Sequence, residues 1–472
     1  MKTLFPKLMP LALLCALHAG AHAGVVADHP GYWMGDLKLP DGRVLKSGVE
    51  IFKRADGSAW ASFSVPDQGA YNIAVKSMEE KGDTVALQLG FGQMKMTWVG
   101  AHFKAEWTQG GATFPLELEQ VAAFPRKPRP QTPAAPFPYT EETIAIRSTE
   151  GVTLGATLSM PKGVRKDGAK PNVAILVHGS GPQTRDEELA GHQVFAVLSD
   201  YLLRQGIAVL RYDKRGVARS TGDYEGHTQV QLADDLDAVL KAVSARRQFG
   251  RVGLVGHSEG PMVAAKVAAR HPKAGGQPVD FLVSLAGVGL PGLDLIVLQD
   301  RLQATDNGAL PQEVEQLTAY VRHFYAIVIA EADSAARVLA LKAYQSSLPD
   351  ADKAMIAKYR MDRGTLSLEM AAEPALRVLL MADPRTDWRR VACPVLALNG
   401  SLDHQVPPES LTGIVAALRE GGNSKVESKL IPSLNHLFQT AKTGSASEYA
   451  QIDETIAPVA LQQVAAFIRK QK

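Results

Sequence analysis

The chain has 472 residues, 46% of them hydrophobic, which is enough to bury a large core divided over two or three domains. Its 51 lysines and arginines balance 49 aspartates and glutamates, and such an evenly mixed surface argues against nucleic acid or an acidic membrane as the partner. The two cysteines, Cys15 and Cys393, exclude a disulfide framework and a metal site built on thiolates.

Residues 1–23 have the pattern of a secretory signal peptide. Lys2 and Lys7 lead into an apolar run, and Ala21 and Ala23 place small residues where a signal peptidase reads the chain. We therefore expect cleavage after Ala23 and a periplasmic or secreted mature protein. No later stretch approaches the ~18 apolar residues of a membrane-spanning helix, so no transmembrane segment is predicted.

Residues 24–121 are predicted to form a small antiparallel β-domain, either a sandwich or a barrel. Short alternating runs are separated by turn residues at the spacing of hairpins. Four of these runs are VEIFKR, AWASFSV, YNIAVKS and TVALQLG. We interpret the four tryptophans of this segment as core residues rather than as a binding face. Residues 122–139 are rich in proline and predict an extended linker.

Residues 140–472 have a different pattern, in which strands alternate with helices after an initial hairpin. This alternation predicts a parallel sheet with helices on both faces. The expected strands of the sheet are NVAILVHG, IAVLRYD, VGLVG, FLVSLAG, PVLALNG and VESKLIP. Between about residues 288 and 388 the strands stop, and a mostly helical segment rich in alanine and leucine follows. We expect this segment to be a lid over the strand ends.

The stretch GHSEG, residues 256–260, places Ser258 between a buried strand and an alanine-rich helix. So short a connection forces the serine into a tight turn with strained backbone angles. A Cβ at Gly256 or Gly260 would collide with the neighbouring strand or helix, which explains the two glycines. The pattern is that of a nucleophile elbow, which presents a hydroxyl at a helix N-terminus.

A serine nucleophile needs a base to accept its proton and an acid to orient that base. Asp403 follows one late strand and His436 follows the next, so both lie where the strand ends of an open α/β sheet gather. The order Ser258, Asp403, His436 is that of α/β-hydrolase triads. Weaker candidates are His404 for the base and Asp383 for the acid.

The oxyanion of an acyl-transfer intermediate needs two fixed N–H donors. The amide of Glu259, directly after the nucleophile, is the first candidate. The second should come from the loop HGSGPQTRDE, where we expect the amide of Ser180, with Gly179 as the alternative. His178 is interpreted as a donor that orients this loop, and His257 as a packing residue.

The loop RYDKRGVARST carries charges directly after a strand, and we expect Asp213 and Arg215 to pair there and stiffen the rim of the site. His436, His404 and Asp403 lack the spacing of metal ligands, so no metal site is predicted. No glycine-rich phosphate loop follows the first strand of the sheet, and no cofactor is expected.

Several motifs together resemble one family. They are HGSGPQTRDE, YDKRGVARST, VGLVGHSEG, NGSLDHQVP and LNHLF, with DQGAYNIAV and WTQGGATFPLELE in the N-terminal part. The chain resembles bacterial α/β-hydrolase esterases with an extra N-terminal β-domain, close to the serine aminopeptidase and prolyl-oligopeptidase branches. It departs from that family in GVARS, where GVGKS is usual, and in Pro261, where glycine is usual.

The resemblance implies a doubly wound α/β-hydrolase sheet with a helical lid, and a carboxylic-ester hydrolase for short acyl chains with Ser258, Asp403 and His436 as its triad. The expected partner is a small-molecule ester. The alternative is a serine peptidase, an aminopeptidase or acyl-peptide hydrolase, with the same triad. A third hypothesis is a non-catalytic binding protein that keeps the fold. The sequence predicts neither the natural ester nor the oligomeric state.

Overall fold

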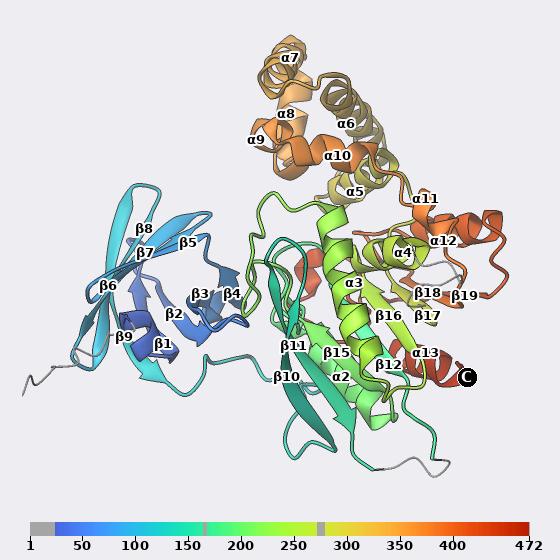
Figure 1. The fold of residues 1–472 in the computed structure, drawn as a ribbon. Coiled ribbons are helices and arrows are strands. Elements are labelled where there is room, and N and C mark those ends of the chain that lie inside the picture. The colour runs from blue at the N-terminus through green and yellow to red at the C-terminus, as the bar shows by residue number, and fades with distance from the viewer. Residues whose placement is uncertain (1–23, 164–167, 271–278, 472) are drawn as a thin grey trace, which may run out of the picture.

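The structure is a computed structural model that describes residues 24–163, 168–270 and 279–471. The predicted signal peptide, residues 1–23, lies outside the described residues. Figure 1 shows three parts: an N-terminal sheet in blue and cyan, a larger α/β part, and a group of helices that stands above it. Among the described residues, no helix is both long and apolar enough to span a lipid bilayer.

The N-terminal part is one antiparallel sheet of nine strands in the order β4-β3-β2-β1-β9-β8-β7-β6-β5. The strands are β1 (Gly31–Lys38), β2 (Val44–Lys53), β3 (Ala59–Val65), β4 (Ala70–Ala74), β5 (Ser77–Lys81), β6 (Thr84–Leu89), β7 (Gly92–Val99), β8 (His102–Gln109) and β9 (Ala112–Val121). Two meanders are joined by pairing of β1 with β9. Because β4 and β5 are its two edges, the antiparallel β-domain, expected as a sandwich or a barrel, is a single half-barrel sheet.

One face of the half-barrel holds its hydrophobic core. Along β8, buried and solvent-facing residues alternate, as expected for a sheet with one covered face. The short helix α1 (Val25–Asp28) buries Val25 and Val26 in the same core. Trp33 and Trp107 are buried there as predicted, while Trp60 is only partly buried and lies under the guanidinium of Arg54.

The proline-rich linker is docked on the α/β part rather than free. Buried Arg129 donates through Nη2 to the carbonyl of Ala450 at 2.9 Å. Gln131 donates through Nε2 to the carbonyl of Ile456 at 2.7 Å and accepts from the amide of Thr455 at 2.6 Å. These contacts fix the path of the chain between the two sheets.

The second sheet has eight strands in the order β10-β11-β15-β12-β16-β17-β18-β19. They are β10 (Tyr139–Arg147), β11 (Thr153–Pro161), β12 (Val173–Val177), β15 (Ala208–Tyr212), β16 (Val252–His257), β17 (Phe281–Leu285), β18 (Val395–Gly400) and β19 (Val426–Ile431). The β10–β11 hairpin is antiparallel and the strands from β15 to β19 run parallel, as the alternating pattern predicts. Their carboxyl ends therefore meet at one edge.

Helices cover both faces of this sheet, which gives the α/β-hydrolase fold. Two separate hydrophobic clusters lie on the two faces. One face packs against α2 (Val194–Arg204) and α13 (Pro458–Lys470), and the other against α3 (Gln229–Ala245), α4 (Gly260–Arg270) and α12 (Glu409–Glu420). Neither α12 nor the small hairpin of β13 (Glu188–Leu189) and β14 (His192–Gln193) was predicted from the sequence.

The helical segment between β17 and β18 forms a lid with a core of its own. Its helices are α5 (Gly292–Asp306), α6 (Pro311–Ala330), α7 (Ser334–Ser347), α8 (Asp350–Lys358), α9 (Leu368–Ala372) and α10 (Pro374–Met381). In Figure 1 these helices stand above the strand ends of the sheet, with α5 nearest to it. The short α11 (Arg385–Trp388) returns the chain, and Trp388 is buried in the core of the sheet.

Candidate active site

Ser258 occupies the sharp turn between β16 and α4 that the sequence predicts. Its φ of +58° lies in the left-handed region, which side-chain-bearing residues rarely adopt. A Cβ on Gly256 would lie 2.4 Å from the nitrogen of Pro261, and one on Gly260 would lie 2.0 Å from the carbonyl oxygen of Val177. The steric reason inferred for both glycines is therefore confirmed. Pro261 is accommodated in the first turn of α4.

Ser258, His436 and Asp403 form a line of hydrogen bonds across three strand ends. Nε2 of His436 lies 3.0 Å from the Ser258 Oγ, and its Nδ1 lies 2.9 Å from the Asp403 Oδ2. Asp403 also accepts from the amides of Gln405 at 3.0 Å and Val406 at 2.8 Å, which hold the carboxylate in place. The Asp403 and His436 side chains are buried. Donation from Nδ1 to Asp403 leaves Nε2 free to accept the serine proton.

The two weaker candidates lie elsewhere. His404 turns away from Asp403, and its Nδ1 lies 3.1 Å from the carboxylate of Asp306 on α5. Asp383 binds its neighbour Arg385, and the hydrogen bond from this guanidinium holds the pKa of the carboxyl below its usual range. Neither side chain contacts the nucleophile.

His257 does more than pack, and here the interpretation from sequence is corrected. Its Nδ1 lies 3.1 Å from Oε1 of Glu187, and its Nε2 lies 2.9 Å from the carbonyl oxygen of His436. Burial lowers the pKa of His257, but the Glu187 carboxylate and the His436 carbonyl outweigh it, so the net pKa is raised. The ring can therefore donate at both nitrogens and tie the backbone of His436 to Glu187.

Glu187 also holds the loop that follows β12. Its Oε1 accepts the amide of Gly179 at 2.6 Å, so this N–H is occupied and Gly179 is removed as the alternative oxyanion donor. The amides of Ser180 and Glu259 have no hydrogen-bond acceptor among the described residues. These are the two donors expected from the sequence. Sequence reasoning missed Glu187 because it lies 70 positions from His257.

His178 anchors the start of the same loop. Its ring contacts the carbonyl oxygen of Tyr212 on the neighbouring strand through Nε2. Complete burial lowers the pKa of His178 to about 4, so the ring is neutral near pH 7. A neutral ring that donates to a strand carbonyl orients the loop, in agreement with the prediction.

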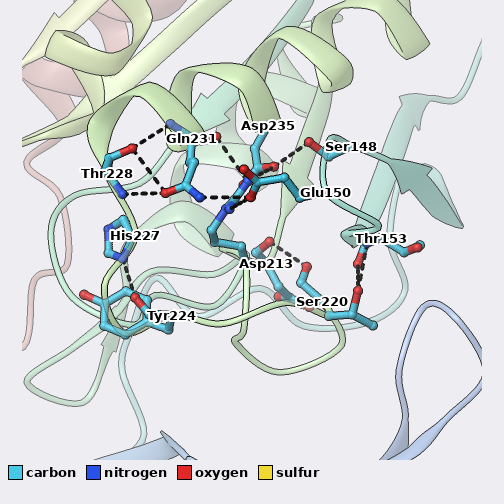
Figure 2. A network of polar contacts seen from close by, with 12 residues as sticks. Ser148, Glu150, Thr153, Asp213, Ser220, Tyr224, His227, Thr228, Gln231 and Asp235 are labelled. Carbon is cyan, nitrogen blue, oxygen red and sulfur yellow. Dashed lines mark hydrogen bonds and ion pairs between the residues drawn. The ribbon is translucent and has the colours of Figure 1, made fainter.

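The charged loop after β15 pairs differently from the expectation. The Asp213 carboxylate accepts a hydrogen bond from Nε of Arg185 at 3.0 Å, and not from Arg215. Arg215 instead binds Asp235 of α3, with Nε at 2.7 Å and Nη2 at 2.9 Å from the two carboxylate oxygens. Figure 2 shows Asp235 and the polar residues around it, Ser148 and Glu150 among them. The predicted Asp213–Arg215 pair is thus wrong, because each side chain finds a partner on a different element.

A cavity of about 240 Å³ opens beside Ser258. Its lining comes from residues 179–190, 257–258 and 405–449 and includes Leu189, Leu437 and Tyr449. The volume is below the roughly 300–1,000 Å³ of pockets for drug-sized ligands, so it suits a small group. A larger cavity of about 620 Å³ between β10 and α3 is lined by Arg147, Asp234 and their neighbours; its lining includes Ser148 and Thr149 but no histidine that could activate them. Chemistry, not size, therefore places the site at Ser258.

The N-terminal domain contacts two loops at the rim of this site. Asn72 donates through Nδ2 to Oε2 of Glu188 at 2.7 Å, directly after Glu187. Arg219 binds Glu50 at 3.0 Å, and its carbonyl accepts the amide of Ala55 at 2.7 Å. The half-barrel thus supports the loops that shape the site.

Within the described ranges, no group of three or more His, Cys, Asp or Glu side chains is arranged to hold a metal ion. Cys393 is a free thiol, and burial raises the pKa of its thiol to about 12, so it is not a reactive thiolate.

Sequence comparisons match the chain to a family of serine hydrolases and to two esterases. The sequence profile of the serine aminopeptidase S33 family matches residues 190–440, more than half of the chain. Esterase EstD of Thermotoga maritima is 26% identical over 306 residues, which cover 64% of this chain and 61% of the relative. A bifunctional esterase/perhydrolase of Acinetobacter calcoaceticus is 38% identical over 88 residues, which cover 19% of this chain and 29% of that protein. The chain therefore spans less than two thirds of either relative.

Among solved structures, an esterase of Pyrococcus furiosus is 14% identical, with a TM-score of 0.40, and the alignment covers 71% of this chain and 92% of that one.

Proposed function

Because the chain belongs to the serine aminopeptidase S33 family of hydrolases, we propose that it is a serine carboxylic-ester hydrolase that acts on short-chain acyl esters. The observation that carries the proposal is the hydrogen-bonded line from Ser258 through His436 to Asp403. The esterase names of the two relatives support the ester as the reacting group. The 240 Å³ cavity supports a short acyl chain.

The reaction begins when Nε2 of His436 accepts the Ser258 proton as Oγ bonds to the ester carbonyl carbon. Asp403 orients the ring and stabilises its positive charge. The carbonyl oxygen becomes an oxyanion held by the amides of Ser180 and Glu259. The intermediate then collapses: the bond to the alkoxy oxygen breaks, and His436 gives its proton to the leaving alcohol. Water, activated by the same histidine, resolves the acyl-enzyme.

A serine peptidase is the second candidate, since the same triad serves both reactions. An exopeptidase needs carboxylates to bind the free amine of its substrate. Among the described lining residues of the cavity, Glu187 is the one carboxylate; its Oε1 binds His257 and Gly179, and its Oε2 is buried without a hydrogen-bond partner. This arrangement favours the ester over the aminopeptidase substrate.

The test is hydrolysis of p-nitrophenyl esters from acetate to palmitate, beside aminoacyl p-nitroanilides, by the wild type, Ser258→Ala and the exposed-serine control Ser347→Ala. We expect rapid turnover of the short esters that is lost in Ser258→Ala and kept in Ser347→Ala. Turnover confined to the anilides would assign the peptidase activity instead. A protein without Ser258-dependent turnover, and unreactive toward a fluorophosphonate, would be a binding protein that keeps the fold.

We also propose that the protein is exported and acts in the periplasm or outside the cell. The support is the sequence of residues 1–23, with its basic start, apolar run and Ala-x-Ala ending. Cell fractionation and N-terminal sequencing test it: the mature chain should begin at Gly24, and a chain retained in the cytoplasm with its Met1 would contradict the proposal.

A further inference from the structure

A buried lysine joins the two segments that carry the expected oxyanion donors. Lys214 lies in the loop after β15, and its side chain is 3% exposed. Its ammonium donates to the carbonyl oxygen of Gly179 at 2.8 Å and to Oε2 of Glu259 at 3.2 Å. Gly179 directly precedes Ser180, and Glu259 directly follows Ser258. One cation therefore contacts both sides of the position that a substrate carbonyl would occupy.

The contact with Gly179 acts on the peptide unit that includes the Ser180 amide. In a planar trans peptide the C=O and the N–H point in opposite directions. Holding the Gly179 oxygen at Lys214 therefore fixes the direction of the Ser180 N–H. This peptide runs beside the nucleophile, because a Cβ on Gly179 would lie 3.1 Å from the Cβ of Ser258. The amide of Gly179 is held in turn by Glu187, so the residue is bound on both sides.

An ammonium group that is hydrogen-bonded to a peptide oxygen also polarises that peptide. Electron density moves toward the oxygen, and the N–H becomes a better donor, an effect that a low local dielectric strengthens. In the ground state the Ser180 amide has no hydrogen-bond acceptor among the described residues. The gain is therefore realised when the oxyanion forms, which is the condition for an interaction to accelerate the chemical step.

We propose that Lys214 is a positioning residue of the oxyanion hole, which orients and polarises the Gly179–Ser180 peptide and holds the segment after Ser258 through Glu259. The inference rests on the proposed serine-hydrolase function. A purely structural role would require only that the lysine balance Glu259. That carboxylate is itself 19% exposed and can be hydrated by water, whereas the Gly179 carbonyl meets the ammonium in a buried contact.

The experiment compares Lys214→Met, Glu259→Gln and the double variant Lys214→Met/Glu259→Gln with the wild type in the full chain. Lys241→Met, on the exposed face of α3, is the matched control for loss of a lysine. Three quantities are measured: kcat and KM for p-nitrophenyl acetate, the Ki of an aryl trifluoromethyl ketone that forms an oxyanion adduct with the serine, and the thermal unfolding temperature.

Removal of an oxyanion donor typically lowers kcat by about 10²–10³-fold. Lys214→Met leaves the donor in place but unsupported, so we expect a fall of roughly 10–100-fold in kcat with KM nearly unchanged. The Ki should rise by the same factor, because the inhibitor makes the same oxyanion. The double variant should remain as slow as Lys214→Met, and it should unfold at least as high in temperature as Lys214→Met, since Glu259 no longer carries a charge that has lost its partner.

A double variant with wild-type kcat would overturn the proposal, because the loss would then come from the unpaired Glu259. An unchanged Ki beside a lowered kcat would also overturn it. Failure of the proposed function is distinguishable from both: the wild type itself would then show no Ser258-dependent turnover.

Discussion

The buried pair of Arg215 and Asp235 gives the sharpest stability prediction. Its two side chains are 3% and 2% exposed and are joined by two short hydrogen bonds. Replacing Arg215 with methionine leaves the Asp235 carboxylate buried with Ser148 as its remaining close donor, at 2.5 Å. Loss of one partner of a buried ion pair typically costs about 3–5 kcal/mol. Because Ser148 still donates, we expect a value near the lower end, about 3 kcal/mol.

Two further variants separate the charge from the packing. Arg215 also contacts Glu150 at 3.4 Å, but that side chain is 59% exposed, so Glu150→Gln should cost below about 1 kcal/mol. The double variant Arg215→Met/Asp235→Leu removes both charges and should be clearly more stable than Arg215→Met alone, since a buried pair replaced by apolar groups is often nearly neutral.

The assay is urea unfolding, monitored by the far-UV circular dichroism signal of the helices. Helices are concentrated in the α/β part and the lid, whereas four of the five tryptophans lie in the half-barrel, so the two signals separate the domains. The reasoning would be refuted if the double variant were as unstable as Arg215→Met, or if Arg215→Met unfolded within about 1 kcal/mol of the wild type.

Three other predictions concern the triad, the elbow and the lid. Asp403→Asn should keep the fold but lower kcat by about 10³–10⁴-fold, because the amide favours the wrong tautomer of His436; steady-state kinetics would contradict this with a loss below tenfold. Gly260→Ala puts a Cβ 2.0 Å from the Val177 oxygen, so thermal unfolding should show a loss of roughly 1–3 kcal/mol together with a lowered kcat. Burial raises the pKa of Asp300 to about 7 from its ordinary 3.8, so the folded chain binds the extra proton, and its stability falls as pH rises from about 4 to 7. Asp300→Asn should remove this fall, and pH-dependent unfolding of both proteins measures it.

Local patterns were sufficient for much of the fold. β-Branched apolar runs predicted the strands of the central sheet, and their alternation with helices predicted that these strands run parallel. Gly256 and Gly260 indicated the elbow, because at both positions a Cβ would clash with the backbone and only glycine fits. The positions of Asp403 and His436 followed from strand ends, since the carboxyl ends of parallel strands must share one edge. The predicted triad residues therefore lie within hydrogen-bonding distance of each other.

The contacts between polar side chains could not be predicted in the same way. Arg215 and Asp213 lie two positions apart, yet each pairs with a residue from another element. His257 and Glu187 meet across 70 positions, and Lys214 reaches Gly179 across 35. Likewise, the strand runs were compatible with a sandwich or a barrel; the pairing of β1 with β9 made one sheet of them, and the edges β4 and β5 left that sheet a half-barrel. Hydrophobic periodicity is fixed by neighbours along the chain, whereas the partner of a long charged side chain depends on which elements pack together. The sequence by itself therefore determined the elements and the candidate triad, and the tertiary structure decided what supports them.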